Sequence, residues 1–267
     1  MKLFCAILTL MLCAAPRASA QRLVSLLPSN TEILYAIGAG PLMGVSRFCD
    51  YPPEASSVEK IGDLLHPNLE RISQLRPDIV FAGEWKSPPT TERIRKMGIP
   101  VFAVPEATSL GALLNNITLI GEAVGKRQQA RACAEEIKKA VASLKLPPET
   151  QRPLVYVEVD SPHWTTGGDS YISDLVEQAG GRNIFAEEKK AYFSASWESI
   201  VAKKPDVILV LSRNASNLAK LPLAEKIPAV RAGRILRPQN ADIYLRPSPR
   251  VKLAILELHG LLNGKKQ

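Results

Sequence analysis

The stretches "LERISQLRPDIV" at residues 69–80 and "WESIVAKKPDVI" at residues 197–208 decide the fold, because one repeats the other. They are offset by 128 residues throughout, and Glu, Ile, Pro and Asp are identical at four aligned positions. Asn68 or Ser196 precedes each copy and can cap a two-turn helix, and a Pro-Asp pair ends that helix before a buried strand. A period this long predicts two similar lobes, because solenoid repeats recur about every 20–50 residues.

Short aliphatic and β-branched runs alternate with helical patterns along the chain. The runs predicted as strands are 23–27, 78–82, 101–104, 154–159, 206–211 and 234–236. The patterns predicted as helices are 31–37, 69–75, 91–97, 109–124, 128–144, 172–179, 197–203 and 250–262. Strands that are almost continuously apolar and separated by helices predict parallel sheets covered on both faces. The predicted fold is therefore α/β, with two Rossmann-like lobes.

A run of strong helix formers, "KRQQARACAEEIKKAVASLK" at residues 126–145, lies between the two copies and stops at Pro147-Pro148. It predicts one long helix joining the lobes; an ordinary surface helix within one lobe is the alternative. The predicted division is a signal peptide (1–20), an N-terminal α/β lobe (21–125), an inter-lobe helix (126–146) and a C-terminal α/β lobe (147–267).

The first twenty residues have the pattern of a cleavable secretory signal. Lys2 precedes an apolar run over residues 3–15, and Ala18-Ser19-Ala20 supplies small residues before a cleavage site after Ala20. The run is too short to span a bilayer. Cys13 follows Leu12, which is too large for a lipoprotein signal, so the sequence predicts an exported protein whose mature chain starts at Gln21. A buried N-terminal helix is the alternative.

Composition excludes several classes of protein. The chain has 267 residues, 46% hydrophobic and 22% charged, which excludes a disordered chain, a collagen, a coiled coil and a disulfide scaffold. Its net charge of +8 falls to +6 when Lys2 and Arg17 leave with the signal. The remaining charges are scattered, so nucleic-acid binding is disfavoured. No other segment of about 20 apolar residues predicts insertion into a membrane.

Two cysteines, Cys49 and Cys133, remain after removal of the signal. An exported compartment permits a disulfide between them, but Cys49 lies in a predicted loop and Cys133 in a predicted helix. Two separate thiols are the favoured interpretation, and the disulfide stays open.

Enzyme motifs are missing from the sequence. It has no GxSxG, no phosphate loop ending in Gly-Lys-Ser/Thr and no HExxH. Gly38, Gly40 and Gly44 imitate a dinucleotide-binding loop but follow a helix, where a helix C-cap and turn are expected. The chain has three histidines, which are dispersed, and no Cys/His cluster has zinc spacing. No cofactor, no metal site and no catalytic activity are predicted.

Four motifs together resemble one family: "LPSNTEILYAIGAG" (27–40), "SRFCDYPPEA" (46–55), "PNLERISQLRPDIV" (67–80) and "RPSPR" (246–250). They resemble the substrate-binding proteins of bacterial ABC importers, in the subgroup for vitamin B12, haem and ferric siderophores. The members that bind vitamin B12 are the most similar, over residues 22–263. The resemblance implies two α/β lobes joined by a single long helix, with the ligand in the cleft between them.

The resemblance also implies ligand-binding residues. Aromatic side chains provide large apolar contacts for a flat corrin, and Asp and Arg can hydrogen-bond its amide rim. The residues carried over are Phe48, Trp85, Trp164, Tyr192, Asp242, Tyr244 and Arg246. Ordinary core packing is the alternative for any one of the aromatic residues.

Some positions depart from the B12-binding members. Leu64 replaces Trp, Leu245 replaces an acidic residue and Arg47 replaces a small polar residue, which predicts a less aromatic and more positive cleft. These departures favour haem or a ferric siderophore as the alternative ligand. His66 and His163 lie near predicted cleft loops and could ligate a metal, although an ordinary loop position is the favoured interpretation.

Glu70 and Glu198 occupy equivalent positions in the two copies, each in the first turn of its helix. A negative charge there is stabilised by the helix dipole by about 0.3–1 kcal/mol. The resemblance adds a second role, since the family uses one Glu on each lobe to dock onto the permease of its ABC importer.

The expected protein is thus a monomeric periplasmic receptor that captures cobalamin or a related corrinoid and delivers it to an ABC importer. A haem or ferric-siderophore receptor of the same fold is the alternative. An exported α/β enzyme is a remote third interpretation, because the sequence offers no candidate triad.

Overall fold

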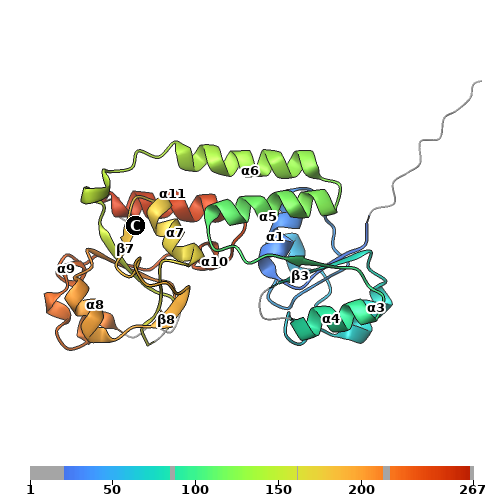
Figure 1. Ribbon diagram of the computed structural model, residues 1–267, viewed down its shortest axis with the longest axis horizontal. Coiled ribbons are helices and arrows are strands. Elements are labelled where there is room, and N and C mark those ends of the chain that lie inside the picture. Colours follow the sequence, from blue (N-terminus) through green and yellow to red (C-terminus); the bar gives the residue numbers. More distant parts are fainter. Residues whose placement is uncertain (1–20, 85–87, 161, 213–216, 265–267) are drawn as a thin grey trace, which may run out of the picture.

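The computed structural model describes residues 21–84, 88–160, 162–212 and 217–264. Two α/β lobes lie side by side, and helix α6 (Arg127–Ala142) runs along one side of both (Figure 1). The expected signal segment, residues 1–20, lies outside the described residues. Across the described ranges, the structure contains no helix with the length and apolarity needed to cross a membrane.

The N-terminal lobe is built on a parallel sheet with the strand order β2-β1-β3-β4. Its strands are β1 (Leu23–Ser25), β2 (Gly44–Val45), β3 (Ile79–Gly83) and β4 (Val101–Val104). Its helices are α1 (Pro28–Ala36), α2 (Pro53–Ser56), α3 (Leu69–Leu75), α4 (Pro88–Lys96) and α5 (Leu110–Ala123).

The C-terminal lobe is built on a parallel sheet with the order β7-β5-β9-β10, and an antiparallel pair, β6 and β8, lies beside it. Its strands are β5 (Leu154–Glu158), β6 (Trp164–Thr166), β7 (Arg182–Asn183), β8 (Tyr192–Ser194), β9 (Val207–Val210) and β10 (Ile235–Leu236). Its helices are α7 (Tyr171–Gln178), α8 (Trp197–Lys203), α9 (Pro228–Arg231), α10 (Asp242–Leu245) and α11 (Val251–Leu262).

The two main sheets have the same connectivity. The first strand of each lobe, β1 or β5, is central and pairs with both the second and the third strands of its sheet. The third strand, β3 or β9, follows the repeated helix, and the fourth strand pairs with it. The structure therefore shows the α/β fold with two parallel-sheet lobes that the repeat predicted.

The repeated helices begin and end in the same way. Asn68 accepts a hydrogen bond from the backbone N–H of Arg71 (2.9 Å), and Ser196 accepts one from Ser199 (3.2 Å). Each helix ends at a residue in the left-handed region, Arg76 (φ 46°) or Lys204 (φ 49°). Proline follows each of these residues and prevents the helix from continuing.

The identical aspartates of the Pro-Asp pairs tie each repeated unit to the central strand of its sheet. Asp78 accepts a hydrogen bond from the backbone N–H of Arg22 (2.7 Å), and Asp206 accepts one from Leu154 (2.9 Å). In return, the backbone N–H of Asp78 donates to the carbonyl of Arg22, and that of Asp206 donates to the carbonyl of Leu154. This reciprocal pair explains why Asp is identical in the two copies.

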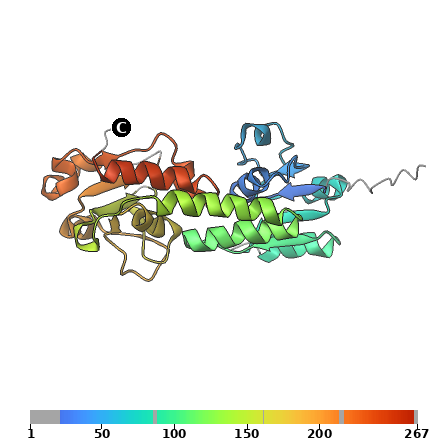
Figure 2. The same cartoon turned by 90° about the horizontal axis from the view of Figure 1, so that it is seen from above.

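Helix α6 begins one residue later and ends three residues earlier than the 126–145 helix run indicates. It runs beside α5, as Figure 2 shows from above. A Cβ atom at Gly121 of α5 would lie 2.2 Å from the Cβ of Ala130, so the two helices require glycine at this contact. On its other side α6 contacts α11, where Lys252 forms an ion pair with Glu136.

Cys49 and Cys133 are both free thiols. Cys49 is buried and accepts a hydrogen bond from the hydroxyl of Thr31 (Oγ1–Sγ 3.1 Å), whereas Cys133 is half-buried on α6. Burial raises the pKa of both thiols, so neither is activated as a nucleophile.

Candidate functional site

A cleft with a volume of about 850 Å³ lies between the two lobes. The N-terminal lobe lines it with residues that follow β1 and β4, at the carboxyl ends of two parallel strands, where α/β proteins place their ligands. The C-terminal lobe lines it with the β6–β8 pair, the start of α7 and the segment after α10. Residues far apart in sequence therefore meet around one space.

Two aromatic side chains form part of the C-terminal wall. The register of the β6–β8 pair places Trp164 opposite Ser194 and Tyr192 opposite Thr166, so both rings extend from the same face of this pair. Trp164 is 42% exposed and Tyr192 is 36% exposed, which is high for rings of this size. Both line the cleft and offer an apolar surface to a ligand.

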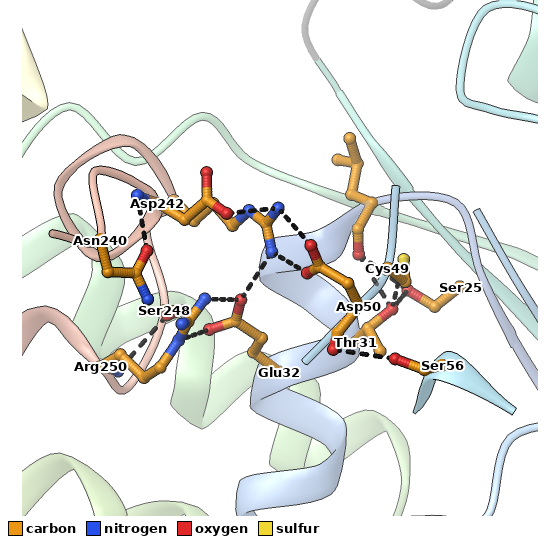
Figure 3. A network of polar contacts seen from close by, with 12 residues as sticks. Ser25, Thr31, Glu32, Cys49, Asp50, Ser56, Asn240, Asp242, Ser248 and Arg250 are labelled. Atoms are coloured by element: carbon orange, nitrogen blue, oxygen red, sulfur yellow. Dashed lines mark hydrogen bonds and ion pairs between the residues drawn. The ribbon is translucent and has the colours of Figure 1, made fainter. Parts of the chain in front are cut away.

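Arg246 follows α10 directly and lines the cleft, and it contacts three carboxylates, those of Glu32, Asp50 and Asp242, which are labelled in Figure 3. Its guanidinium lies 2.5 Å from an Asp50 oxygen, 3.0 Å from Asp242 and 3.4 Å from Glu32. Asp50 and Glu32 belong to the N-terminal lobe, so Arg246 connects the lobes. Hydrogen bonding to Arg246 holds the pKa of Asp50 below its usual value.

A second inter-lobe ion pair joins Glu32 of α1 to Arg250, the residue before α11 (Figure 3). Arg250 binds both carboxylate oxygens of Glu32, through Nη2 and through Nε, the latter at 2.7 Å. The Glu32 side chain is only 1% exposed, and the Arg250 guanidinium also lies 4.0 Å from the centre of the Tyr51 ring. We call Glu32, Asp50, Asp242, Arg246 and Arg250 the inter-lobe network.

A larger hollow of about 1030 Å³ borders this network at Glu32 and Arg250. Residues of α1, α2, α6 and the start of α11 line it, together with Glu32 and Arg250. The inter-lobe network thus has members in both linings, with Arg246 in the cleft and Glu32 and Arg250 in the hollow. The smaller cleft is the candidate ligand site, because it combines exposed aromatic rings with strand ends of the N-terminal lobe.

Three of the ligand-binding residues expected from the sequence, Trp164, Tyr192 and Arg246, line the cleft. Tyr244 does not: it is fully buried and its hydroxyl donates to Glu257 (3.0 Å). Successive side chains of a helix point about 100° apart, so in α10 Tyr244 is turned into the core while its neighbour Leu245 lines the cleft. In this structure Tyr244 therefore lies in the core and outside the cleft lining.

The other expected ligand-binding residues lie elsewhere. Asp242 forms an ion pair with Arg246 but does not itself line the cleft. Phe48 is 55% exposed, outside the cleft lining, with the Arg47 guanidinium 4.9 Å from its ring centre. Trp85 lies outside the described residues.

The extra positive charge expected in the cleft is largely neutralised by partners. Arg47 forms an ion pair with Asp63 (2.5 Å) and does not line the cleft, and Arg246 belongs to the inter-lobe network. Lys190 does line the cleft, and its ammonium group lies 6.0 Å from the centre of the Phe193 ring. Of the two cationic residues in the described part of the cleft wall, Arg246 is paired with carboxylates, whereas Lys190 forms no ion pair with a described carboxylate.

Neither histidine named as a possible metal ligand lines the cleft. The His66 side chain is 85% exposed beside Asp63. His163 stacks on Trp197, with ring centres 5.4 Å apart, and its Nδ1 lies 3.6 Å from Glu158. Within the described ranges, no group of three or more His, Cys, Asp or Glu residues is arranged to hold a metal ion.

Sequence reasoning missed several residues of the cleft wall, which are Asn30, Glu106, Asn116, Tyr171 and Lys190. Asn30 and Asn116 are buried and donate to the carbonyls of Ala82 in β3 and Pro105 after β4, so each ties its helix to the N-terminal sheet. Asn30 comes soon after the predicted strand over 23–27, which was an available signal, whereas Asn116 lies inside the predicted helix over 109–124. Nothing in the local pattern distinguishes Tyr171 from other residues at a helix start.

Glu70 and Glu198 are both exposed and occupy the first turns of α3 and α8. Gln74 donates to Glu70 at 3.3 Å. Figure 1 shows α3 and α8 in different lobes, both on the side of the molecule away from α6. The repeat thus presents two equivalent carboxylates on one side of the protein.

Residues 23–239 match the model of a protein family described as periplasmic binding protein. A curated relative, the vitamin B12-binding protein of Yersinia pestis (strain Pestoides F), is 29% identical over 259 residues, which cover 95% of this chain and 90% of the relative.

Solved structures with the same fold include binding proteins for two kinds of ligand. The periplasmic vitamin B12 binding protein BtuF of Vibrio cholerae superimposes with a TM-score of 0.72 at 27% identity, covering 93% of this chain and 99% of that one. The periplasmic heme-binding protein RhuT of Roseiflexus sp. RS-1, in its apo form, gives a TM-score of 0.78 at 26% identity, covering 93% and 100%.

Proposed function

We propose, from the premise that this chain belongs to the periplasmic binding protein family, that it captures cobalamin or a related corrinoid and delivers it unchanged to an ABC importer. The observation that carries the proposal is the cleft of about 850 Å³, with the exposed rings of Trp164 and Tyr192 on one wall. A corrin is a broad plate with apolar faces and an amide-bearing rim. Such a ligand gains from large aromatic contacts and from hydrogen-bonding groups at its edge.

The charge of the cleft supports a corrinoid over haem. The two propionates of haem would need cationic partners, but Arg246 is already occupied by Asp50, Asp242 and Glu32. Partial burial, with the Glu106 carboxylate nearby, raises the pKa of Tyr192 to about 12. The raised pKa makes the phenolate form, which would bind ferric iron, harder to reach, so Tyr192 is better suited to donate a hydrogen bond.

Haem remains the second candidate, because Lys190 offers one cation to a propionate and a heme-binding protein shares the fold. The two ligands are separated by titrating the purified protein with cyanocobalamin and with haemin while following tryptophan fluorescence and the visible spectrum. We expect saturable quenching by cyanocobalamin and weaker, poorly saturable quenching by haemin. Saturable haemin binding without a response to cyanocobalamin would replace the corrinoid proposal with the haem one.

Removing one aromatic wall tests whether ligand binds in this cleft. Trp164→Ala should weaken cobalamin binding by about 1–3 kcal/mol, the scale of burying one large side chain. Trp197→Phe is the control. The indole N–H of Trp197 donates to the Pro222 carbonyl (2.6 Å), and the Trp197 ring does not line the cleft, so this variant should bind cobalamin like the wild type. Equal affinities of Trp164→Ala and wild type would place the ligand elsewhere.

Export follows from the same proposal. Cleavage after Ala20 would give a mature chain that begins at Gln21, recovered from the periplasmic fraction without detergent. N-terminal sequencing of that fraction is the measurement, and incorporation of labelled palmitate would instead indicate that Cys13 is lipidated.

We further assign Glu70 and Glu198 to docking onto the two halves of a permease, since opposite charges fix the register of such interfaces. The double variant Glu70→Arg, Glu198→Arg should keep its affinity for cobalamin and lose most uptake. A matched double variant, Glu135→Arg with Glu149→Arg, changes the charge equally at exposed residues of α6 and the segment after it. Normal uptake by the first pair would leave these glutamates as helix-terminus acids only.

A further inference from the structure

Tyr171 is a buried residue of the cleft whose hydroxyl has no hydrogen-bond partner among the described residues. It is the first residue of α7, directly after Ser170, which caps the helix by accepting from the backbone N–H of Ser173 (3.0 Å). The side chain is only 3% exposed, and its ring lines the cleft. The cap fixes the backbone at the start of the helix, where Tyr171 leaves the chain.

Other buried tyrosines of the same lobe do have partners. The Tyr156 hydroxyl bonds to Glu158, and the Tyr244 hydroxyl donates to Glu257 at 3.0 Å. A buried hydroxyl without a partner carries its full cost of desolvation, so native structures contain few of them. Tyr171 thus differs from its neighbours in a way that lowers the stability of the protein without ligand.

The ionisation state of Tyr171 decides what its hydroxyl can do. Burial, together with the nearby Asp174, Tyr192 and Glu32, raises the pKa of Tyr171 well above its usual value. At pH 7 the group is therefore a neutral phenol with a proton to donate. The partner that suits it is an acceptor oxygen, not a cation.

We infer that the Tyr171 hydroxyl donates a hydrogen bond to an acceptor oxygen of the bound ligand. The inference rests on the proposed function, in which that oxygen is an amide carbonyl at the rim of a corrinoid. Tyr192 lines the same wall of the cleft, is 36% exposed and lies near Tyr171, so a ligand that contacts the Tyr192 ring comes close to Tyr171. Tyr171 is then a specificity-determining residue, because a ligand edge without an acceptor would leave its hydroxyl unpaired.

The test is Tyr171→Phe, which removes only the hydroxyl. The protein without ligand should become more stable, with an unfolding midpoint about 2–4 °C higher, because an unpaired buried donor is lost. Its affinity for cyanocobalamin should fall about tenfold, because the bond to the ligand is also lost. If the hydroxyl had a purely structural role, its removal would lower both the unfolding midpoint and the affinity. A lower midpoint, or an unchanged affinity, would therefore overturn the inference.

Tyr156→Phe is the matched control. It removes a hydroxyl that bonds to Glu158 away from the cleft, so its midpoint should fall and its affinity should stay that of the wild type. Failure of the proposed function is distinguishable, since wild-type protein would then not bind cyanocobalamin at all. Haemin would replace cyanocobalamin as the probe in that case, with a loss of affinity in Tyr171→Phe supporting the inference and equal affinity overturning it.

Discussion

The two lobes share a scaffold but line the cleft with different chemistry. In the N-terminal lobe, β1 ends at Ser25 and α1 begins at Pro28, so the first strand leads almost directly into the first helix. In the C-terminal lobe, β5 ends at Glu158 and α7 begins only at Tyr171. The intervening segment contains β6 and, with β8, carries Trp164 and Tyr192 into the cleft. The repeat preserves what folds each lobe, and a local extension supplies the aromatic wall.

Charge is divided between the lobes as well. The N-terminal lobe contributes the carboxylates Glu32 and Asp50, and the C-terminal lobe contributes the guanidinium groups of Arg246 and Arg250. Opposite charges that meet only when the lobes are correctly placed hold the relative position of the two halves. The asymmetry of the inter-lobe network thus complements the symmetry of the sheets.

Removing the buried carboxylate should have the largest effect on stability. Glu32→Gln leaves Arg250, whose side chain is 10% exposed, without its charge partner, and breaking such a pair costs about 3–5 kcal/mol. Urea denaturation of Glu32→Gln, Arg250→Gln and the double variant measures the free energy of unfolding that each variant loses. We expect the double variant to be more stable than the sum of the single losses predicts, because neither charge is left unpaired. Additive losses would contradict a specific pair.

The scaffold was predictable from sequence because local signals and burial agree there. The helices over 69–75 and 197–203 match the structure at both ends, since a polar cap begins each one and proline follows it. The short strands β2, β6, β7 and β8 were missed, because none of them lies in an aliphatic run of the kind that marks the equally short β1 and β10. The inter-lobe network was also beyond prediction, as Glu32 and Arg250 are 218 residues apart and only the packed lobes bring them together.

The aspartates of the Pro-Asp pairs should contribute unequally. Asp206→Ala should destabilise the protein by about 1–2 kcal/mol, because its carboxylate accepts the first N–H of the central strand β5 at a half-buried position. Asp78 makes the same bond to Arg22 at an exposed position, so Asp78→Ala should cost less. Thermal unfolding of both variants compares the lobes, and a larger loss from Asp78→Ala would contradict this ranking by exposure.

The two helix caps should contribute almost equally. Asn68→Ala and Ser196→Ala each remove a side-chain acceptor from an exposed helix start, which costs about 1 kcal/mol. Denaturant midpoints of the two variants should agree with each other. A clear difference between them would show that the copies no longer depend equally on their caps.

The smallest expected effect concerns Asp50, whose side chain is 63% exposed, and it appears in the pH dependence of stability. Hydrogen bonding to Arg246 lowers the pKa of Asp50 in the folded protein, whereas the unfolded value is about 3.9. The ionised form is thus favoured by folding, so its contribution is fully present above about pH 4 and is lost as the pH falls through the lowered folded pKa. Asp50→Asn should be less stable than wild type by under about 1 kcal/mol at pH 7, the usual range for an exposed ion pair. The difference should close on acidification and shrink in 1 M salt. A stability difference that persists at pH 2 would mean that Asp50 acts through packing and not through its charge.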